Sequence, residues 1–353
     1  MKKWAPLLLS VVLLLIQIMG YLQLRRFPAF VEKWYSMGIY TYISRAMRIG
    51  LGWIPFSFGD ILYVLIIILV IRWFVIHFKE VVTLSRKRYT QVFTALNIIL
   101  AFFHFAWGFN YYRQPLNEIL ELDATYTDEE LIRVTQKLVF TANALHEQLQ
   151  PVDSLKVEFT RSQSELFELA PSGFSNLGAV YPSLDYGPAS IKKSLLTLPL
   201  TYMGYSGYLN PITGEAQTNG YIDNYKTPVL ILHEMSHQLG FAKENEANFI
   251  AVLAGMNHDD LYFQYSATIF ALGYCLNDLS MKDPLQMELA RAAMHYGIIE
   301  NYQDLRDFWA PYNDNVIEKI SQKTYESYLK ANNQPDGMRT YSYVVALLVN
   351  YYK

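Results

Sequence analysis

The chain of 353 residues is more apolar than an average soluble protein, with hydrophobic residues at 52% and 28 tyrosines. Its formal net charge of −3 provides no basic surface of the kind that nucleic acid requires, so we expect no nucleic-acid partner. The one cysteine, Cys275, excludes an internal disulfide.

The first apolar segment, Trp4 to Leu24, carries no charge and is long enough to cross a bilayer. Lys2 and Lys3 precede it, as they would in a cleavable signal peptide. Residues 18–21 nevertheless make a poor cleavage site, because they do not follow the small-x-small pattern. We therefore expect a retained anchor near residues 4–24.

The next segment, from Leu24 to Asp60, mixes basic and aromatic residues. This mixture is typical of helices that lie in the membrane interface. The residues concerned are Arg25, Arg26, Lys33, Trp34, Tyr35, Tyr40, Tyr42, Arg45, Arg48 and Trp53.

Two further spans are predicted, near Ile61–Phe78 and Val92–Phe109. Arg72 interrupts the earlier one, but a long cationic side chain can extend to the membrane surface. Two buried core helices are the alternative interpretation. In the later span, Asn97 and His104 are expected to form hydrogen bonds between helices rather than to bind a ligand.

The charges flanking the spans indicate an orientation. Lys2, Lys3 and the basic loop Lys79–Arg88 favour the cytoplasm, which places the chain after the third span outside. The basic residues of the segment from Leu24 to Asp60 argue for the opposite orientation. We expect a multi-pass protein of the plasma (inner) membrane with an extracytoplasmic C-terminal domain.

The remainder divides into two patterns. Thr127-Asp128-Glu129-Glu130 is a capping box that opens a helix to about Leu149. Residues 152–225 are rich in turn formers, with short runs such as Ser194–Leu198 that resemble strands, and the chain from Thr227 onward is helical in pattern. The end, Tyr341–Tyr352, predicts a packed helix. This order indicates an α+β domain.

The motif His233-Glu234-Met235-Ser236-His237 carries the most specific chemistry. Residues four apart share a helix face, so His233 and His237 can bind one metal ion, while Glu234 can take a proton from a water on that metal. Thr227 suits a helix N-cap, and Gly240 suits the C-terminal cap. A coincidental match, or a remnant without metal, is the alternative.

A third ligand is expected from the helix that follows. A catalytic zinc takes three protein ligands and keeps one position open, so Glu244 or Glu246 should face the histidines. Glu244 lies four residues before Asn248, whose amide could orient it, and we favour Glu244 for that reason. Glu246 is the alternative third ligand, or a charge that stabilises the helix start.

These residues resemble the glutamate-zincin metallopeptidases, which carry H-E-x-x-H and then E-x-x-A-[DN] on a second helix. The matching residues are His233, Glu234, His237, Glu244, Ala247 and Asn248. The resemblance implies Zn2+ held by His233, His237 and Glu244, with Glu234 as general base. Only six residues separate His237 from Glu244, which is shorter than in many members. The whole chain also resembles an uncharacterised bacterial membrane family with three N-terminal spans.

In zincins a strand before the metal helix lies beside the cleft and pairs with the substrate. The segment in that position is Gly207–Asn219, so Glu215 and Asn219 are candidates for contact with a peptide or with water at the metal. A solvated turn is the alternative. Tyr265 is a candidate donor to the transition-state oxyanion, although packing in the core suits it equally.

The sequence therefore predicts a membrane anchor over residues 1–112 and a zincin-like catalytic domain over residues 113–353. The predicted activity is hydrolysis of a peptide or protein substrate by a membrane-anchored zinc metallopeptidase. The alternatives are a membrane-bound binding or assembly module with a structural or inactive zinc site, and a sensor that signals through its spans.

Overall fold

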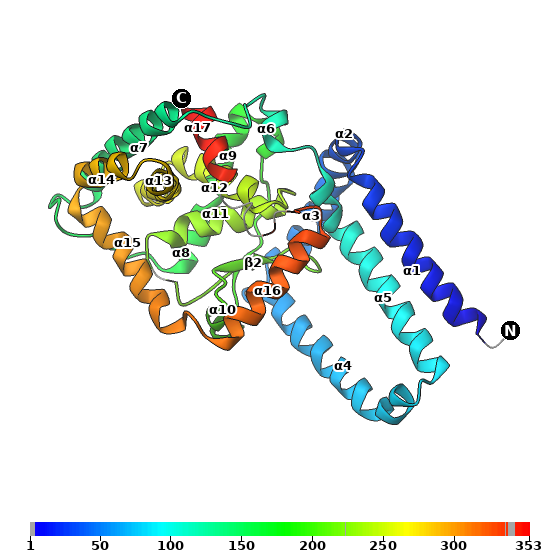
Figure 1. Ribbon diagram of the computed structural model, residues 1–353. Helices are drawn as coiled ribbons and strands as arrows, with labels where there is room; N and C mark the ends of the chain where they lie inside the picture. The colour runs from blue at the N-terminus through cyan, green and yellow to red at the C-terminus, as the bar shows by residue number, and fades with distance from the viewer. Residues whose placement is uncertain (1–3, 223, 336, 338–342) are drawn as a thin grey trace.

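The computed structural model describes residues 4–222, 224–335, 337 and 343–353. Three helices, α1 (Ala5–Leu24), α4 (Phe58–Val82) and α5 (Arg86–Ala106), are long and apolar enough to cross a membrane. They project together from one side of the molecule (Figure 1). The prediction of three apolar N-terminal helices is confirmed, with the second and third each starting a few residues earlier than expected.

The start of α4 has a local cause. Ser57 is its N-cap, and the Ser57 hydroxyl accepts a hydrogen bond from the amide of Asp60 at 3.0 Å. Between α1 and α5, the amide nitrogen of Asn97 donates to the carbonyl of Ser10 at 2.8 Å, and the Asn97 oxygen accepts from Gln17 at 2.8 Å. Asn97 thus joins two spans, as expected.

The predicted interfacial segment forms α2 (Pro28–Val31), a π-helical stretch η1 (Glu32–Ile39) and α3 (Tyr40–Gly52). One face of α3 packs on the C-terminal domain, where the Ser44 hydroxyl donates to the carbonyl of Gln238 at 2.7 Å. The other face leaves Tyr42 and Trp53 exposed. The segment is therefore helical as expected, but α3 also packs directly on the C-terminal domain.

The C-terminal domain is mostly helical. Its centre is α13 (Leu261–Lys282), which packs against α7 (Asp128–Leu149) and α12 (Glu244–Met256), while α12 also packs against α11 (Lys226–Gln238). The capping box of α7 is present, with the Thr127 hydroxyl accepting from the amide of Glu130 at 3.2 Å. The C-terminal helix α17 (Val344–Tyr352) is buried against this core; residues 341 and 342 lie outside the described residues.

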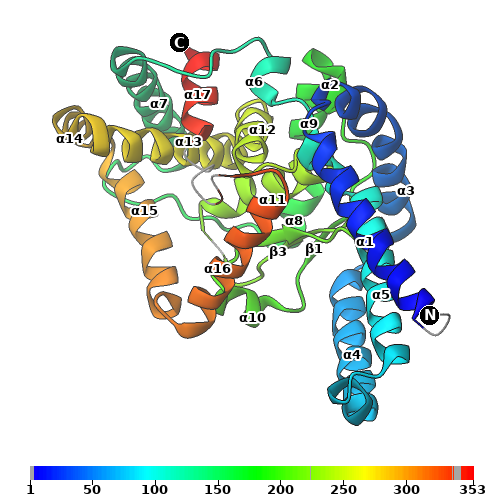
Figure 2. The same cartoon turned by 45° about the vertical axis from the view of Figure 1, so that its right-hand side comes forward.

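One small sheet accompanies these helices. Its strands are β1 (Ile191–Lys193), β2 (Gly207–Leu209) and β3 (Ala216–Thr218), in the order β1-β3-β2. Strand β3 is parallel to β1 and antiparallel to β2. The sheet packs against α11 (Figure 2). The expected α+β domain is thus a helical domain with a minor sheet.

The strand expected at Ser194–Leu198 is wrong, because β1 ends at Lys193 and helix α10 (Thr197–Tyr202) follows. Side chains in this turn bind the backbone and compete with a strand ladder: the Thr197 hydroxyl donates to the carbonyl of Ser194 at 2.7 Å. The remaining elements are α6 (Leu116–Ile119), α8 (Gln163–Leu169), α9 (Pro171–Val180), α14 (Pro284–Ala293), α15 (Tyr296–Trp309), α16 (Val316–Ala331), and the 3₁₀ turns η2 (Gly108–Tyr112), η3 (Pro182–Leu184) and η4 (Ala310–Tyr312).

Candidate metal centre

Helix α11 presents the H-E-x-x-H motif, and its C-terminus sets the path of the chain to α12. Gly240 has a φ of +88°, its amide bonds the carbonyl of His237, and the amide of Phe241 bonds the carbonyl of Ser236. This pair of bonds is a Schellman motif, which reverses the chain after one turn and brings Glu244 back toward the histidines.

The expected N-cap of α11 is wrong. Thr227 lies inside the helix, and its hydroxyl donates back to the carbonyl of Ile222 at 2.9 Å. The side chain of Asn224 instead accepts from the amide of Lys226 at 3.0 Å, so the helix begins earlier than the Thr-Pro pair indicated.

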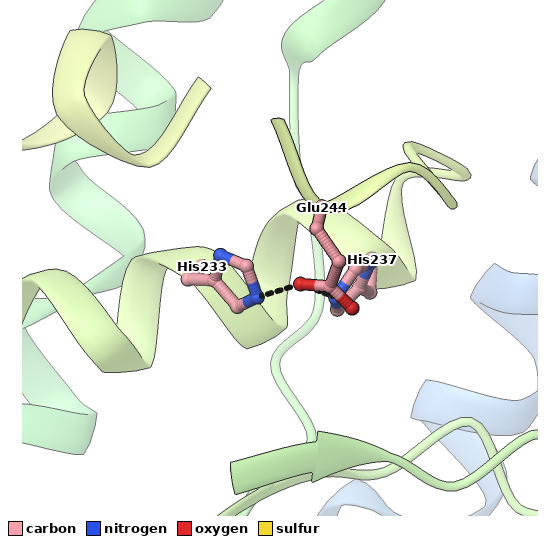
Figure 3. A group of neighbouring side chains, drawn as sticks. All are labelled: His233, His237 and Glu244. Carbon is pink, nitrogen blue, oxygen red and sulfur yellow. Dashed lines mark ion pairs between the residues drawn. The ribbon is translucent and has the colours of Figure 1, made fainter. Parts of the chain in front are cut away.

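Three side chains converge at one point (Figure 3). The Nε2 atom of His233 lies 3.1 Å from Oε2 of Glu244, and Nε2 of His237 lies 3.8 Å from the same oxygen. One ligand atom from each of the three residues lies within 4.8 Å of the others. Two imidazoles and one carboxylate are the protein ligand set of a catalytic zinc with an open fourth position, so the donors present fit that metal.

The orientation of His237 is set by its other ring nitrogen. Nδ1 of His237 lies 2.7 Å from the carbonyl oxygen of Phe241, so Nδ1 carries the proton and Nε2 presents its lone pair toward Glu244. Burial lowers the pKa of His237 to about 4, against the opposing charge of Glu244. The ring is therefore neutral, as a metal ligand requires.

Glu244 stays ionised in this setting. Burial raises its pKa, but the hydrogen bond with His233 and the positive charges that His237 and His233 carry when protonated outweigh burial and lower the pKa of Glu244 to about 2. The hydroxyl of Tyr325, on α16, also donates to Oε1 of Glu244. Nothing in the sequence indicated Tyr325, which lies 81 positions away from Glu244.

Glu234 and Glu246 are both buried, and each keeps an Oε2 atom without a hydrogen-bond partner among the described residues. Of the two, Glu234 lines the cavity. Burial, with the charge of Glu244 added, raises the pKa of Glu234 to about 8 despite His233 and Lys226. A Cβ atom at Gly207 would lie 2.6 Å from Oε1 of Glu234, so only glycine at this point of β2 leaves space for the carboxylate.

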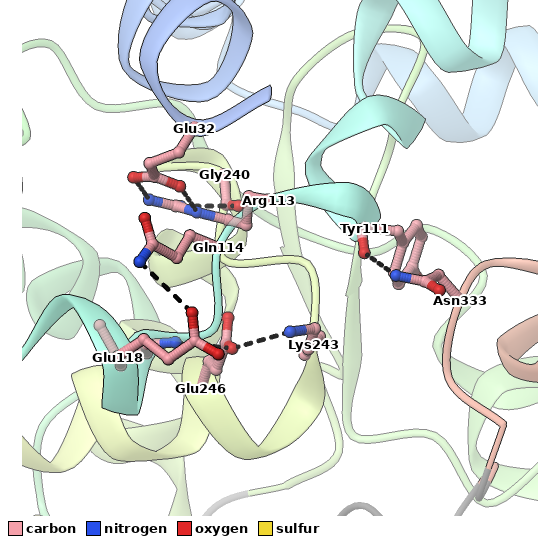
Figure 4. A network of polar contacts seen from close by, with 10 residues as sticks. Glu32, Tyr111, Arg113, Gln114, Glu118, Gly240, Lys243, Glu246 and Asn333 are labelled. Atoms are coloured by element: carbon pink, nitrogen blue, oxygen red, sulfur yellow. Dashed lines mark hydrogen bonds and ion pairs between the residues drawn. The ribbon is translucent and has the colours of Figure 1, made fainter. Parts of the chain in front are cut away.

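Glu246 does not join the metal ligands. Its Oε1 atom accepts from the amide of Leu116 at 3.1 Å and from Nζ of Lys243 at 3.1 Å (Figure 4). Glu246, the alternative third ligand, therefore holds the backbone of Leu116 and the side chain of Lys243. Residues two apart on a helix face different ways, which is why only one of the pair can reach the histidines.

Asn248 lines the cavity, but its amide donates to the hydroxyl of Tyr274 at 3.1 Å. Within the described chain no hydrogen bond joins it to His233, His237 or Glu244. No direct hydrogen bond among the described residues therefore supports the expected role of Asn248 in orienting Glu244.

The tentative substrate contacts are also placed elsewhere. Glu215 is fully buried and accepts from the amides of Phe58 and Gly59 at 3.0 and 2.6 Å. Asn219 is fully buried and donates to the hydroxyl of Thr201 at 2.8 Å. Neither lines the cavity. Backbone and side-chain groups from distant segments bind these polar atoms, so the structure gives both residues a place in the packing of the domain.

Tyr265 lies in the core and is likewise absent from the cavity wall. Its side chain is fully buried, and its hydroxyl donates to Oδ1 of Asn301 at 2.8 Å. The packing interpretation of Tyr265 is the one that the structure supports.

The triad and Glu234 border a cavity of about 640 Å³ with mostly aromatic and aliphatic walls. Strand β2 lies in its wall and is the edge of the sheet, since it pairs with β3 alone among the described strands. Lys226 also lines the cavity. It precedes His233 by seven residues, or about two helical turns, so its place on the same helix face could have been predicted from the sequence. The other lining side chains include Tyr63, Trp107, Tyr111, Leu196, Pro199, Leu200, Met203, Tyr205, Tyr208, Phe270, Gln322, Tyr325 and Tyr328.

Comparison with known proteins adds a family and no activity. No curated protein and no solved structure matches the chain significantly. One family model, described as a protein of unknown function (DUF3810), matches residues 35–349, which include the long apolar helices α4 and α5 and the side chains of His233, His237 and Glu244. The chain therefore belongs to the DUF3810 family.

Proposed function

We propose that this protein is a membrane-anchored zinc metallopeptidase. The observation that carries the proposal is the convergence of His233, His237 and Glu244 beside the buried, unpartnered carboxylate of Glu234, at a cavity of about 640 Å³. Zinc held by the two Nε2 atoms and the Glu244 carboxylate would polarise a peptide carbonyl and acidify a water molecule.

Glu234 acts as the general base in this proposal. Its Oε2 atom accepts a proton from the attacking water and then delivers it to the departing amine. Burial raises the pKa of Glu234, which favours its uptake of a proton from the water. Burial in the cavity wall also keeps bulk water from competing for that proton.

Two further groups suit a peptide substrate. The free edge of β2 offers backbone hydrogen bonds to an extended chain lying along the cavity. Lys226, whose Nζ atom donates to the hydroxyl of Ser206 at 3.2 Å, supplies positive charge that would stabilise an oxyanion in place of the excluded Tyr265.

The domain is proposed to lie outside the plasma membrane. The start of α5, which carries Arg86-Lys87-Arg88, and the start of α1 both lie at the end of the spans away from the domain (Figure 1). Basic residues favour the cytoplasmic side. Arg48, which argued otherwise in the sequence, is buried and donates to the carbonyl of Pro188 at 2.9 Å, so it serves packing.

A binding module with structural zinc is the alternative. Structural zinc sites are closed by four protein ligands, whereas the described residues bring together three. This difference favours an open, catalytic position.

The test is metal content and proteolysis of the purified full chain in nanodiscs, beside Glu234→Gln and the control Glu246→Gln. We expect bound zinc in all three proteins, and peptide cleavage by the wild type and the control only. If the zinc-loaded wild type leaves every member of a diverse peptide library intact, the peptidase proposal is wrong.

A further inference from the structure

The domain carries an exposed apolar surface on α10 and the first turns of α16, which we call the α10–α16 surface. Soluble domains seldom expose so many large apolar side chains together unless they contact a partner or a membrane. The members are Leu195 (57% exposed), Leu198 (50%), Tyr202 (39%), Val316 (72%), Ile317 (53%) and Ile320 (62%).

The two helices form one continuous surface. Asn315 is the N-cap of α16, and its side-chain amide donates to the carbonyl of Tyr202, at the end of α10, at 2.9 Å. The Tyr202 ring meets the Tyr312 ring edge to face, with centroids 5.3 Å apart. Trp309 ends α15, directly before the η4 turn that contains Tyr312. Tyrosine and tryptophan are the aromatic residues enriched at membrane–water interfaces.

This surface begins where a span begins. Asp60, in the first turn of α4, accepts a hydrogen bond from the amide of Leu195 at 2.7 Å and one from the Ser194 hydroxyl at 2.9 Å. Helices α10 and α16 lie on the side of the domain from which the spans project, and α16 runs crosswise to α4 (Figure 1). The α10–α16 surface therefore continues the lipid-exposed surface of α4.

We infer that the α10–α16 surface docks on the lipid bilayer. The six side chains enter the interface, while Lys323, farther along α16, extends toward lipid headgroups; Lys319 lies 3.6 Å from the carboxylate of Asp314. The inference concerns lipid contact only and is independent of any hydrolytic activity.

Docking also has a consequence for the cavity. Leu196, Pro199 and Met203 line the cavity from the α10 side, and Tyr325 lines it from α16. Tyr63, one turn into the apolar helix α4, lies in the same wall. The cavity thus borders the membrane surface, and its substrate class is a polypeptide attached to or lying on the bilayer; this step rests on the proposed peptidase function.

Lipid contact is tested with single labelled cysteines in the full chain in vesicles. The native Cys275 is fully buried, so introduced cysteines react selectively. Fluorophores at Leu198→Cys and Ile317→Cys should be quenched by brominated lipids, to a degree between Val75→Cys within α4 and Leu285→Cys on α14. Leu285 is exposed, and its helix α14 lies on the side of the domain away from the spans (Figure 1). Quenching no greater than at Leu285 would overturn the docking inference.

The substrate class is tested by cleavage of a peptide library presented free in solution or on an acyl anchor in the same vesicles. Anchored peptides should be cleaved at least about tenfold faster because the surface concentrates them. The double variant Ile317→Asp/Ile320→Asp should lose this preference, and the control Leu285→Asp/Leu289→Asp should keep it.

The outcomes separate the two claims. An unchanged preference in the α16 variant overturns the substrate class. Absence of cleavage by zinc-loaded protein in every format overturns the peptidase function, while the quenching data decide docking alone.

Discussion

Two groups of buried carboxylates lie within this protein, and they differ in how their oxygens are satisfied. At the start of α4, Glu215 accepts two backbone amides and the Thr213 hydroxyl, and Asp60 accepts an amide and two hydroxyls. At the metal centre, Glu234 keeps one oxygen without a partner in the described chain.

The difference indicates what each acid does. A carboxylate whose oxygens are saturated by the protein holds segments together and has little capacity for a new proton or ligand. A buried carboxylate left unsatisfied is costly, and such groups occur where chemistry needs them. Glu215 and Asp60 at the start of α4 are therefore structural. Oε2 of Glu246 is also unpartnered among the described residues, but Glu246 does not line the cavity, so Glu234 is the unsatisfied carboxylate that a ligand in the cavity would meet.

The largest effect is expected from Glu234→Gln. Loss of the general base should lower kcat by about 10²–10⁴-fold, while zinc content stays unchanged because Glu234 is not a ligand. Steady-state cleavage and metal analysis of the same preparation measure both. A variant that cleaves at the wild-type rate would remove the distinction between the two regions.

The second effect concerns the neighbouring acids of α12. Glu244→Gln should weaken zinc binding by at least the 10–100-fold that loss of a supporting partner typically costs, because it replaces a charged ligand. Glu246→Gln should leave the zinc affinity unchanged, since Glu246 bonds Leu116 and Lys243. Competition with a chromophoric chelator measures both affinities, and the reverse ranking would show that Glu246 is the ligand.

The third effect concerns Glu215, which binds the start of α4. Glu215→Gln should destabilise the protein by about 1–3 kcal/mol, because the new amide nitrogen would meet the backbone amides of Phe58 or Gly59, donor against donor. Zinc content should be unchanged. Thermal unfolding in nanodiscs measures the loss, and a stable variant that releases zinc would contradict the structural role.

The fourth effect is the pH dependence of the metal-free protein. The folded pKa of Glu234 is raised to about 8, above its unfolded value, so its contribution to stability is present at low pH and is lost as the pH rises toward 8. His237, with its pKa lowered to about 4, contributes the opposite slope only below its unfolded value, near pH 6.5. Between pH 6.5 and 8, Glu234→Gln should therefore gain stability relative to the wild type.

Denaturant unfolding with chelator present measures this difference. Parallel curves for the two proteins over that interval would mean that Glu234 is already ionised in the metal-free fold.

The smallest effect is expected from Tyr265→Phe. The rate of cleavage should stay within about twofold, and stability should fall by about 1 kcal/mol through loss of the bond to Asn301. A large fall in kcat without loss of stability would return Tyr265 to the catalytic site.

Local patterns predicted much of this fold. Apolar runs of sufficient length identified α1, α4 and α5, and the capping box located α7, because each depends on residues close in sequence. The strand predicted from the run Ser194–Leu198 was wrong, because these residues form a hydrogen-bonded turn and the start of α10. A short apolar run cannot reveal such side-chain competition.

By itself the sequence determined the spans and the pairing of His233 with His237, since residues four apart on a helix share a face whatever surrounds them. Only the tertiary structure decided that Glu215 is structural, because its partner Phe58 lies 157 positions away. Only the tertiary structure likewise decided that the Tyr325 hydroxyl donates to Glu244 and that α16 lies beside the spans. The partners of a buried polar group are chosen by segments that meet only on folding, and no local pattern records that choice.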